Sequence, residues 1–387
     1  MDFELSEEQR AIWHSAYDFA SREWLPHAAQ WDERGHFPRD AIDRAAKLGF
    51  CGLYVAEALG GVGLSRLDAT LVFEALATAC PSTAAYLSIH NMATAMLARH
   101  AEPSVAQQWV PRLASGQALA SYCLTEPNAG SDAASLRTQA RRSGDGYRIS
   151  GSKVFISGAG ASDMLVVMAR TGGAGADGIS AFVVPANSPG IHYGPKERKL
   201  GWNSQPTRTV DFDDVLVPDN HRLGAEGQGF RIALQALDGG RVNIAACSLG
   251  AAYAAWLAAR RYLQQRSQFG RPLASQQALQ FRLADMATML HTARLVVRQA
   301  AAKLDQGAAD ATMYCAMAKR WATDAGFEVC NHALQLHGGY GCTRDFPLER
   351  LLRDARVHQI VEGTNEIMRV IVARHVLQSS TALEPTA

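Results

Sequence analysis

The sequence predicts an α+β protein of several domains: an N-terminal α-helical domain, a middle antiparallel β-barrel or β-sandwich domain, and a C-terminal four-helix-bundle domain. This prediction is based on the spacing at which apolar residues recur along the chain. The spacing is helical up to residue 119, close to two over residues 120–226, and helical again over residues 227–387. We expect domain boundaries where the period changes, at 1–119, 120–226 and 227–387. A chain of 387 residues has room for two or three domains.

The first part of the chain carries the start and stop signals of helices. Ser6 and Gln9 fit a capping box, in which each side chain bonds the backbone N–H of the other residue. Apolar residues at helical spacing follow, and Pro26 bends or ends that run. Further helices are expected over 41–48, 67–78 and 83–100, and the last two are apolar enough to be buried.

The middle part contains short segments that are β-branched or alternating and are separated by Gly, Asn, Asp and Pro. We expect strands over 119–124, 146–157, 164–170, 180–185 and 207–212. Residues 173–178 match the G-x-G-x-x-G pattern of dinucleotide-binding loops, but a strand and not a helix is expected after them. We therefore predict a hairpin loop there and no Rossmann fold.

The last part returns to the helical period. Helices over 230–265, 276–305 and 311–336 are expected, and antiparallel packing in a bundle is the simplest way to bury their apolar faces. Leu279, Leu283, Met286 and Leu290 form one such apolar stripe. Small residues crowd the first of these helices over 239–252, so a neighbouring helix or a ligand must approach its backbone closely.

Composition excludes several classes of function. Hydrophobic residues make up 48% of the chain, charged residues 19%, and the net charge is +1, so neither nucleic acid nor a membrane surface is an expected partner. No run approaches the roughly 18 consecutive apolar residues of a membrane span. The seven scattered cysteines lack a Cys-x-x-Cys pair, which predicts reduced structural thiols and no metal. The acidic start, without an apolar or Arg-rich leader, predicts a cytoplasmic protein.

One carboxylate near the C-terminus has an unusual setting. Glu362 follows two apolar residues and precedes Gly363. A carboxylate held in a dry place has a raised pKa and can act as a base. The same run also fits a helix start, with Thr364 or Asn365 as N-cap and Glu362 as a solvated neighbour. These residues alone leave both interpretations open.

Four separated segments resemble the acyl-CoA dehydrogenase family. They are 122–132 (YCLTEPNAGSD), 239–241 (GGR) with the small-residue helix, 266–273 (RSQFGRPL), and 335–341 (QLHGGYG) together with the run around Glu362. They occur in order and at family-like spacing along the whole chain. Within the family, the chain is most similar to the short branched-chain, isobutyryl-CoA members of valine degradation, on 88–92 (SIHNM), 201–208 (GWNSQPTR) and 239–245 (GGRVNIA).

The resemblance implies a flavin-dependent oxidation. In the family, a base removes the α-proton of an acyl-CoA thioester and the β-carbon passes a hydride to N5 of FAD, which yields a trans-2-enoyl-CoA. By resemblance Glu362 is that base, and its backbone N–H polarises the thioester carbonyl. A thioester α-proton is a very weak acid, so the base must be desolvated and the developing enolate oxygen stabilised. Some branched-chain relatives carry the base on the helix that here holds Gly239 and Gly240, so Glu362 has no rival.

The resemblance also implies the cofactor site, which relatives share between subunits of a homotetramer. The matching positions are Tyr122, Cys123, Leu124, Thr125, Gly130, Ser131, Phe155, Ile156, Ser157, Arg266, Gln268, Phe269, Gln277, Gln335, Leu336, His337, Gly338, Gly339, Thr364 and Glu366. Phe155 stands where many relatives have Trp, so a ring stack is expected without an indole N–H. Asn128 stands where many have Gly, which puts the turn geometry in question. Without the resemblance, Phe155 is equally interpreted as a core residue of the β domain, Arg266 as a charged cap at the end of a helix, and His337 as a structural histidine.

For the acyl-CoA, the matching positions are Ser131, Asp238, Gly239, Gly240, Arg241, Gly363 and Arg374. Asp238 also fits a solvated helix residue. The expected electron acceptor is an electron-transfer flavoprotein. Alternatives are a dehydrogenase for 2-methylbutyryl-CoA or butyryl-CoA, a flavin oxidase on the same fold, a nucleic-acid-binding flavoprotein, and a scaffold with an empty flavin site.

Overall fold

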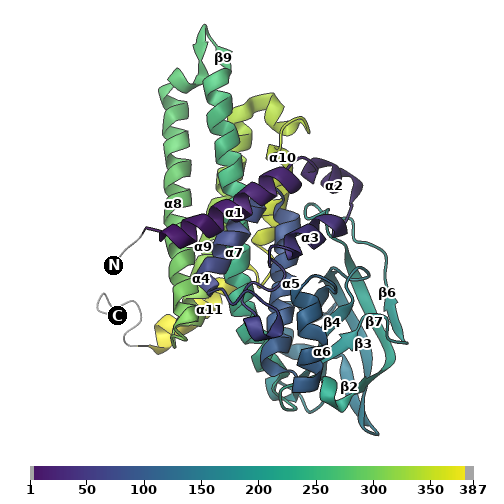
Figure 1. The fold of residues 1–387 in the computed structure, drawn as a ribbon. Helices are drawn as coiled ribbons and strands as arrows, with labels where there is room; N and C mark the ends of the chain where they lie inside the picture. The colour runs from purple at the N-terminus through teal and green to yellow at the C-terminus, as the bar shows by residue number, and fades with distance from the viewer. Residues whose placement is uncertain (1–3, 380–387) are drawn as a thin grey trace.

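The computed structural model describes residues 4–379, which form two helical parts and a β part between them in sequence (Figure 1). The N-terminal helices are α1 (Glu7–Glu23), α2 (Ala28–Arg34), α3 (Arg39–Ala46), α4 (Arg66–Ala77), α5 (Pro81–His100) and α6 (Pro103–Ala114). The predicted capping box is present: Ser6 accepts from the Gln9 N–H, and Gln9 accepts from the Ser6 N–H. Helix α1 ends at Glu23, three residues before Pro26, as predicted. The short helix α2 and the helix α6 were not predicted.

The middle part is one eight-stranded sheet. Its strands are β1 (Ala120–Cys123), β2 (Gln139–Ser143), β3 (Gly146–Ser157), β4 (Met164–Arg170), β5 (Ile179–Pro185), β6 (Ile191–Tyr193), β7 (Thr207–Pro218) and β8 (Arg222–Leu223). The strand order is β6-β7-β3-β2-β4-β5-β8, and β1 pairs with β4. All five predicted strands are present, and β2, β6 and β8 are additional.

The sheet is mixed, whereas the sequence predicted an antiparallel one. Strand β1 pairs with β4 in parallel, in a register from Ala120 opposite Met164 to Cys123 opposite Val167. The reason is the direction from which β1 arrives: it follows helix α6 and is not joined to β4 by a hairpin. Strands β4 and β5 form a true antiparallel hairpin. Its loop contains residues 173–178, so the predicted hairpin loop is confirmed.

The C-terminal part is built on three long helices, which lie side by side in Figure 1. These are α7 (Gly229–Gln265), α8 (Gln277–Asp305) and α9 (Ala311–His337), followed by α10 (Leu348–His358) and α11 (Asn365–Gln378). Strands β9 (Ser267–Gln268) and β10 (Arg271–Pro272) form a small hairpin at the end of α7. The stripe on α8 faces the core, where Met286 and Leu290 are buried and Leu279 and Leu283 pack against it.

Helices of the first and third parts share one hydrophobic core. Phe73 of α4, Ala245 of α7 and Ala322 of α9 belong to the same buried cluster. Close helix contacts make this possible: a Cβ on Gly250 would stand 2.1 Å from the Glu74 carbonyl oxygen of α4. The domain boundaries at 119 and 226 therefore stay a prediction, because the outer parts are packed together. Helix α7 is long and apolar enough to cross a membrane, but 72% of its most apolar window is buried inside the protein.

Candidate active site

Glu362 lies in the short connection between α10 and α11, in an uncommon backbone conformation. Its φ is +57° and that of Gly363 is +90°, both in the left-handed region. A non-glycine residue there costs about 1 kcal/mol or more and persists only where the surroundings enforce it. Thr364 caps α11 by accepting from the Ile367 N–H, so the helix start expected from the sequence is present. The left-handed turn nevertheless directs the Glu362 side chain inward.

The carboxylate of Glu362 is desolvated. Its Oε2 atom is inaccessible to solvent and has no hydrogen-bond partner among residues 4–379. Burial raises the pKa of Glu362 to about 7, although the positive charges of Arg241 and Lys319 pull it down. A carboxylate with this pKa is half-ionised near neutral pH and accepts a proton readily. The solvated alternative is therefore wrong.

Helix α7 provides the space that this carboxylate occupies. A Cβ on Gly240 would lie 2.6 Å from Glu362 Oε2 and 3.1 Å from the sulfur of Met92. A side chain at this position would displace the carboxylate or the methionine. The small residues at 239–252 thus have two functions, because Gly240 faces Glu362 while Gly250 faces helix α4. Of the two explanations expected from the sequence, the close helix is present at Gly250, and the close approach of a ligand stays a prediction.

Arg241 and Asp238 form a buried pair beside Glu362. The Arg241 Nη1 atom donates to Asp238 Oδ1 at 2.7 Å, and its Nε atom donates to the Glu362 carbonyl oxygen at 3.3 Å. Thr312 donates to the second Asp238 oxygen at 2.6 Å. The side chains of Asp238 and Arg241 are nearly fully buried, so Asp238 is not a solvated helix residue. In this arrangement, the pair holds the backbone of the Glu362 turn from the side of α7.

Tyr122 connects this region to the β part. Its hydroxyl group is buried and has no partner among the described residues. Burial and the nearby charge of Glu362 raise the pKa of Tyr122. A buried hydroxyl without a partner costs free energy, which a bound ligand can recover by a hydrogen bond.

Phe155 projects from a break in the sheet. The register between β3 and β7 shifts between Lys153 and Ile156, as in a β-bulge, and Phe155 has a φ of +58°. Its side chain is 67% exposed, whereas Ile156 beside it is buried in the core of the β part. A bulge redirects a side chain that would otherwise follow the pleat. Phe155 is therefore an available aromatic face and not core filling, whereas Ile156 is a core residue whose carbonyl oxygen accepts from the Ala159 N–H.

The segment between β1 and this bulge is firmly anchored. Lys153 donates to the Leu124 carbonyl oxygen at 3.0 Å and to Glu126 at 2.7 Å. Glu126 also accepts from the backbone N–H groups of Arg137 and Thr138. Burial alone would raise the pKa of Glu126, but Lys153 and these N–H groups lower it below its usual value. The neighbouring Cys123 is buried, and Gly130 and Ser131 are exposed on the loop that follows.

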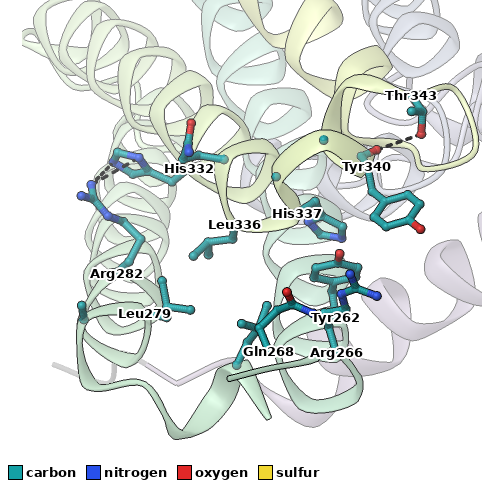
Figure 2. Close-up of a pocket in the computed structure, with 15 residues that line it drawn as sticks. Tyr262, Arg266, Gln268, Leu279, Arg282, His332, Leu336, His337, Tyr340 and Thr343 are labelled. Carbon is teal, nitrogen blue, oxygen red and sulfur yellow. Dashed lines mark hydrogen bonds between the residues drawn. The ribbon is translucent and has the colours of Figure 1, made fainter. Parts of the chain in front are cut away.

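A second region lies at the far end of the long helices. A pocket of about 770 Å³ is lined by Tyr262, Arg266, Gln268, Leu273, Ala278, Leu279, Arg282, His332, Gln335, Leu336, His337, Gly338, Gly339, Tyr340 and Thr343. Figure 2 shows Arg266, Gln268, Tyr262 and His337 close together in it. The rings of Tyr262 and His337 stack with centroids 4.3 Å apart. Arg282 contacts His332 on the opposite side.

The predicted residues thus divide into two separate groups. Arg266, Gln268, Gln335, Leu336, His337, Gly338 and Gly339 line the pocket together. Phe269 is 95% exposed at the tip of the β9–β10 hairpin, with a φ of +54°, and Gln277 starts α8 without lining the pocket. Arg241 and Arg266 are 25 residues apart on and just after α7, which separates them by about 38 Å. The pocket and Glu362 therefore belong to different places on one chain.

The remaining predicted residues lie on α11, at its N-cap, and in the β part. Glu366 and Arg374 are exposed, and Arg374 is about two and a half turns along the helix from Asn365. Thr364 is partly buried as the N-cap. The predicted residues Thr125 and Ser157 are both partly buried; the Thr125 carbonyl accepts from the Val154 N–H.

Sequence reasoning missed several residues that surround Glu362. Lys319 on α9 is fully buried and donates to the turn that carries Glu362. Asn365 accepts from it and is itself buried. Met92 contacts the same space as Glu362, and Tyr54 lies near it under the guanidinium of Arg66. For Lys319, the signal available in the sequence was a lysine on the apolar face of a predicted helix.

Comparison with known proteins agrees with this arrangement. Models of the acyl-CoA dehydrogenase N-terminal, middle and C-terminal domains match residues 6–117, 121–215 and 227–377. The chain therefore belongs to the acyl-CoA dehydrogenase family. It is similar to the mitochondrial isobutyryl-CoA dehydrogenase of Bos taurus, with 53% identity over 97% of this chain and 90% of that protein. It is 50% identical to the enzyme of that name from Dictyostelium discoideum, over 96% and 90% of the two chains.

Solved structures share the fold over nearly the whole chain. Butyryl-CoA dehydrogenase from Megasphaera elsdenii has a TM-score of 0.95 and 38% identity, covering 97% of this chain and 100% of that one. A chain from work on the electron transferring flavoprotein of Acidaminococcus fermentans has a TM-score of 0.96 and 39% identity, covering 98% and 100%. PigA with FAD and proline has a TM-score of 0.94 and 29% identity, covering 98% and 100%.

Proposed function

We propose that the protein is an FAD-dependent acyl-CoA dehydrogenase that acts on a short branched-chain acyl-CoA, with isobutyryl-CoA as its preferred substrate. The observation that carries the proposal is the desolvated carboxylate of Glu362, whose pKa is raised to about 7 and whose Oε2 atom has no partner among the described residues. Family membership and the resemblance to two isobutyryl-CoA dehydrogenases support the reaction and the substrate.

In the proposed mechanism, Glu362 takes the α-proton of the thioester on its carboxylate. FAD, when bound, supplies the hydride-accepting ring. The backbone N–H of Glu362 polarises the thioester carbonyl, and the left-handed turn at Glu362 and Gly363 fixes the direction of the side chain. Arg241 holds this turn through the Glu362 carbonyl oxygen. The packing around Glu362 keeps water from its carboxylate, and this raises the basicity of the carboxylate. A strong base is needed because the thioester α-proton is a very weak acid.

The residues of the β part fit a planar aromatic cofactor. Phe155 offers an exposed ring from a bulge, and the backbone after β1 is anchored by Lys153 next to it. Tyr122 has a buried hydroxyl that no residue within 4–379 bonds. We assign Phe155, Ile156 and Ser157 to one face of the flavin, and Tyr122 to Ser131 to its edge. Thr364 and Glu366 would close over the adenosine part.

The pocket in Figure 2 would hold the adenine side of a different FAD molecule, bound mainly by a neighbouring subunit. Its separation from Arg241 by about 38 Å along the chain supports this assignment, because one cofactor cannot reach both regions. Arg266 is suited to a pyrophosphate because its charge is permanent and its donors form a fork. Gly338 and Gly339 leave open space beside the backbone, where no side chain would obstruct a phosphate. A homotetramer with shared cofactor sites is part of the proposal.

For the acyl-CoA, Gly239 and Gly240 border the space beside Glu362, and Ser131 and Arg374 are exposed for contacts with the CoA part. Asp238 and Arg241 act mainly by holding the Glu362 turn, since they are paired with each other. We place the enzyme in valine catabolism in the cytoplasm, with an electron-transfer flavoprotein as the electron acceptor. The similarity to a chain from work on such a flavoprotein supports that partner.

The test is an anaerobic titration of the purified protein with isobutyryl-CoA, 2-methylbutyryl-CoA and butyryl-CoA, followed by flavin absorbance. We expect a yellow protein whose flavin is bleached most completely, and at the lowest concentration, by isobutyryl-CoA. Colourless protein would contradict the cofactor. Preference for butyryl-CoA would contradict the substrate, and peroxide formation in air at the turnover rate would indicate an oxidase.

A further inference from the structure

Lys319 has an unusual position in the C-terminal bundle. It lies on α9, its side chain is fully buried, and burial lowers its pKa to about 7. An ammonium group has three N–H donors and cannot accept a hydrogen bond. Burying such a group costs free energy unless all three donors are satisfied. The partners of Lys319 therefore indicate why it is present.

All three partners belong to the seven residues that carry Glu362. The Nζ atom donates to the carbonyl oxygens of Gln359 at 3.1 Å and Gly363 at 2.7 Å, and to Oδ1 of Asn365 at 2.9 Å. Two of these acceptors flank the left-handed residue in the chain, and the third begins α11. Lys319 thus ties both ends of the turn to helix α9.

The partners are neutral oxygens and not the carboxylate. The Glu362 Oε2 atom stays without a hydrogen bond from the described residues, although Lys319 is close enough to lower the pKa of Glu362. A direct ion pair would occupy the lone pairs needed for proton abstraction and would lower the basicity further. The observed geometry holds the backbone and leaves the carboxylate free.

Other side chains on α9 reinforce the same contact. Asn365 donates to Thr323 Oγ1 at 2.9 Å and to Asp324 Oδ1 at 2.7 Å, and Gln359 donates to Asp324 Oδ1 at 2.8 Å. The turn is therefore held from α9 at several points and from α7 by Arg241 at one. Lys319 is the only one of the α9 residues named here that donates to carbonyl oxygens on both sides of Glu362.

On the basis of the proposed function, we infer that Lys319 is a positioning residue for the base: it fixes the left-handed turn and keeps the Glu362 carboxylate directed at the substrate. The charged groups that face it are Glu362 on the turn, Asp324 on α9, Arg241 on α7 and Glu366 on α11, with His358 on α10 also within its field. Substitution removes one positive charge from this set and three hydrogen bonds from the turn.

The experiment compares Lys319→Met, Lys319→Gln and Lys319→Arg with a control, Lys303→Met. This control loses an ion pair with Asp310 and a cation–π contact with Tyr314 on the same bundle, and neither partner contacts the Glu362 turn. Turnover of isobutyryl-CoA is measured against pH. The pKa of Glu362 is measured separately, without substrate, from the infrared band of its protonated carboxyl group, identified by its absence in Glu362→Gln. This second measurement does not depend on catalysis.

For Lys319→Met we expect kcat to fall about 10- to 100-fold, since a base displaced by about 1 Å loses that much, while KM changes by less than about threefold. The pKa of Glu362 should rise above about 7, because Lys319 normally lowers it. Lys319→Arg should return that pKa close to the wild-type value and restore part of kcat, since it keeps the charge and several donors. Lys303→Met should change neither quantity.

A folded Lys319→Met variant with wild-type kcat and an unchanged pKa of Glu362 would overturn the inference. If that variant does not fold, Lys319→Gln decides, because it keeps two N–H donors without the charge: a raised pKa of Glu362 supports the inference and an unchanged pKa rejects it. Absence of flavin reduction by any acyl-CoA in the wild type would instead reject the proposed function, and the infrared titration would still report on Lys319.

Discussion

Glu362 combines a strained backbone, a desolvated carboxylate and a free oxygen atom, none of which stabilises the fold. A left-handed φ of +57° and a pKa raised to about 7 both cost free energy of folding. Of the four other described non-glycine residues with left-handed φ, Phe155 and Phe269 belong to the predicted cofactor site, and Trp202 and Asp214 do not.

The rate should depend on pH through Glu362. The base must be ionised to accept the α-proton, and its pKa is about 7, so kcat/KM for isobutyryl-CoA should rise with pH through about 7 and then level off. The rate rises with pH because burial favours the neutral, protonated carboxyl group, so Glu362 becomes ionised only as the pH approaches its raised pKa. Stopped-flow flavin reduction between pH 5 and pH 9 measures it. A rate that falls through this range, or that rises only near the ordinary pKa of glutamate, would contradict a buried Glu362 base with a raised pKa.

Gly240→Ala should separate activity from stability. The new methyl group would stand 2.6 Å from Glu362 Oε2, so the carboxylate must move, and kcat should fall by about 100-fold. Alanine is otherwise preferred over glycine inside a helix by about 1 kcal/mol, so thermal stability should not decrease. Steady-state kinetics and thermal unfolding test both parts. Unchanged kcat would mean that Gly240 does not border the working position of Glu362.

At the scale of elements, helix α7 is both a packing surface and a wall of the active site. Gly250→Ala should have the opposite effect to Gly240→Ala, because its Cβ meets the backbone carbonyl oxygen of Glu74, which cannot move aside. We expect a loss of about 1–3 kcal/mol of unfolding free energy with near-normal activity per folded molecule. Chemical denaturation measures this. Stability equal to that of the wild type would show that the α4–α7 contact relaxes easily.

The elements differed in how well the sequence predicted them. Helices α7, α8 and α9 were predicted within one residue at each end, because long apolar stripes and their end signals leave little choice. The three-residue strand β6 and two-residue strand β8 were missed, since they are too short to show a period. The parallel pairing of β1 was missed because pairing depends on contacts distant in sequence.

For the site, the resemblance seen in the sequence named Glu362 and seven of the fifteen residues that line the pocket, but not the residues that support them. Lys319 has no signature apart from its place on an apolar helix face, because its partners are 40 or more residues away. The pairing of Asp238 with Arg241 was also missed, although the two are one helical turn apart. Resemblance indicated which residues matter, and the structure indicates which of them contact one another.

At the scale of the whole molecule, the proposed homotetramer would bring the two predicted cofactor regions together from different chains. Arg266 lies about 38 Å along α7 from Arg241, so a complete site would take Glu362 from one subunit and Arg266 from another. Symmetric oligomers repeat such a shared site at every equivalent interface.

This arrangement predicts complementation between two inactive variants. Glu362→Gln and Arg266→Glu should each be inactive or poorly loaded with flavin, but mixed oligomers should contain sites with both residues intact. With equal amounts and random pairing, about a quarter of the sites should recover activity. Co-expression with two affinity tags and an assay of the doubly purified protein measures this. No recovery would contradict a cofactor site shared between subunits.

The most direct measurement is anaerobic flavin reduction by isobutyryl-CoA in Glu362→Gln. The amide keeps the size of the side chain but cannot accept the proton, so the thioester should still bind and perturb the flavin spectrum, while reduction should slow by at least about 100-fold. Reduction at the wild-type rate would show that another group removes the α-proton and that the desolvated carboxylate of Glu362 is not the base.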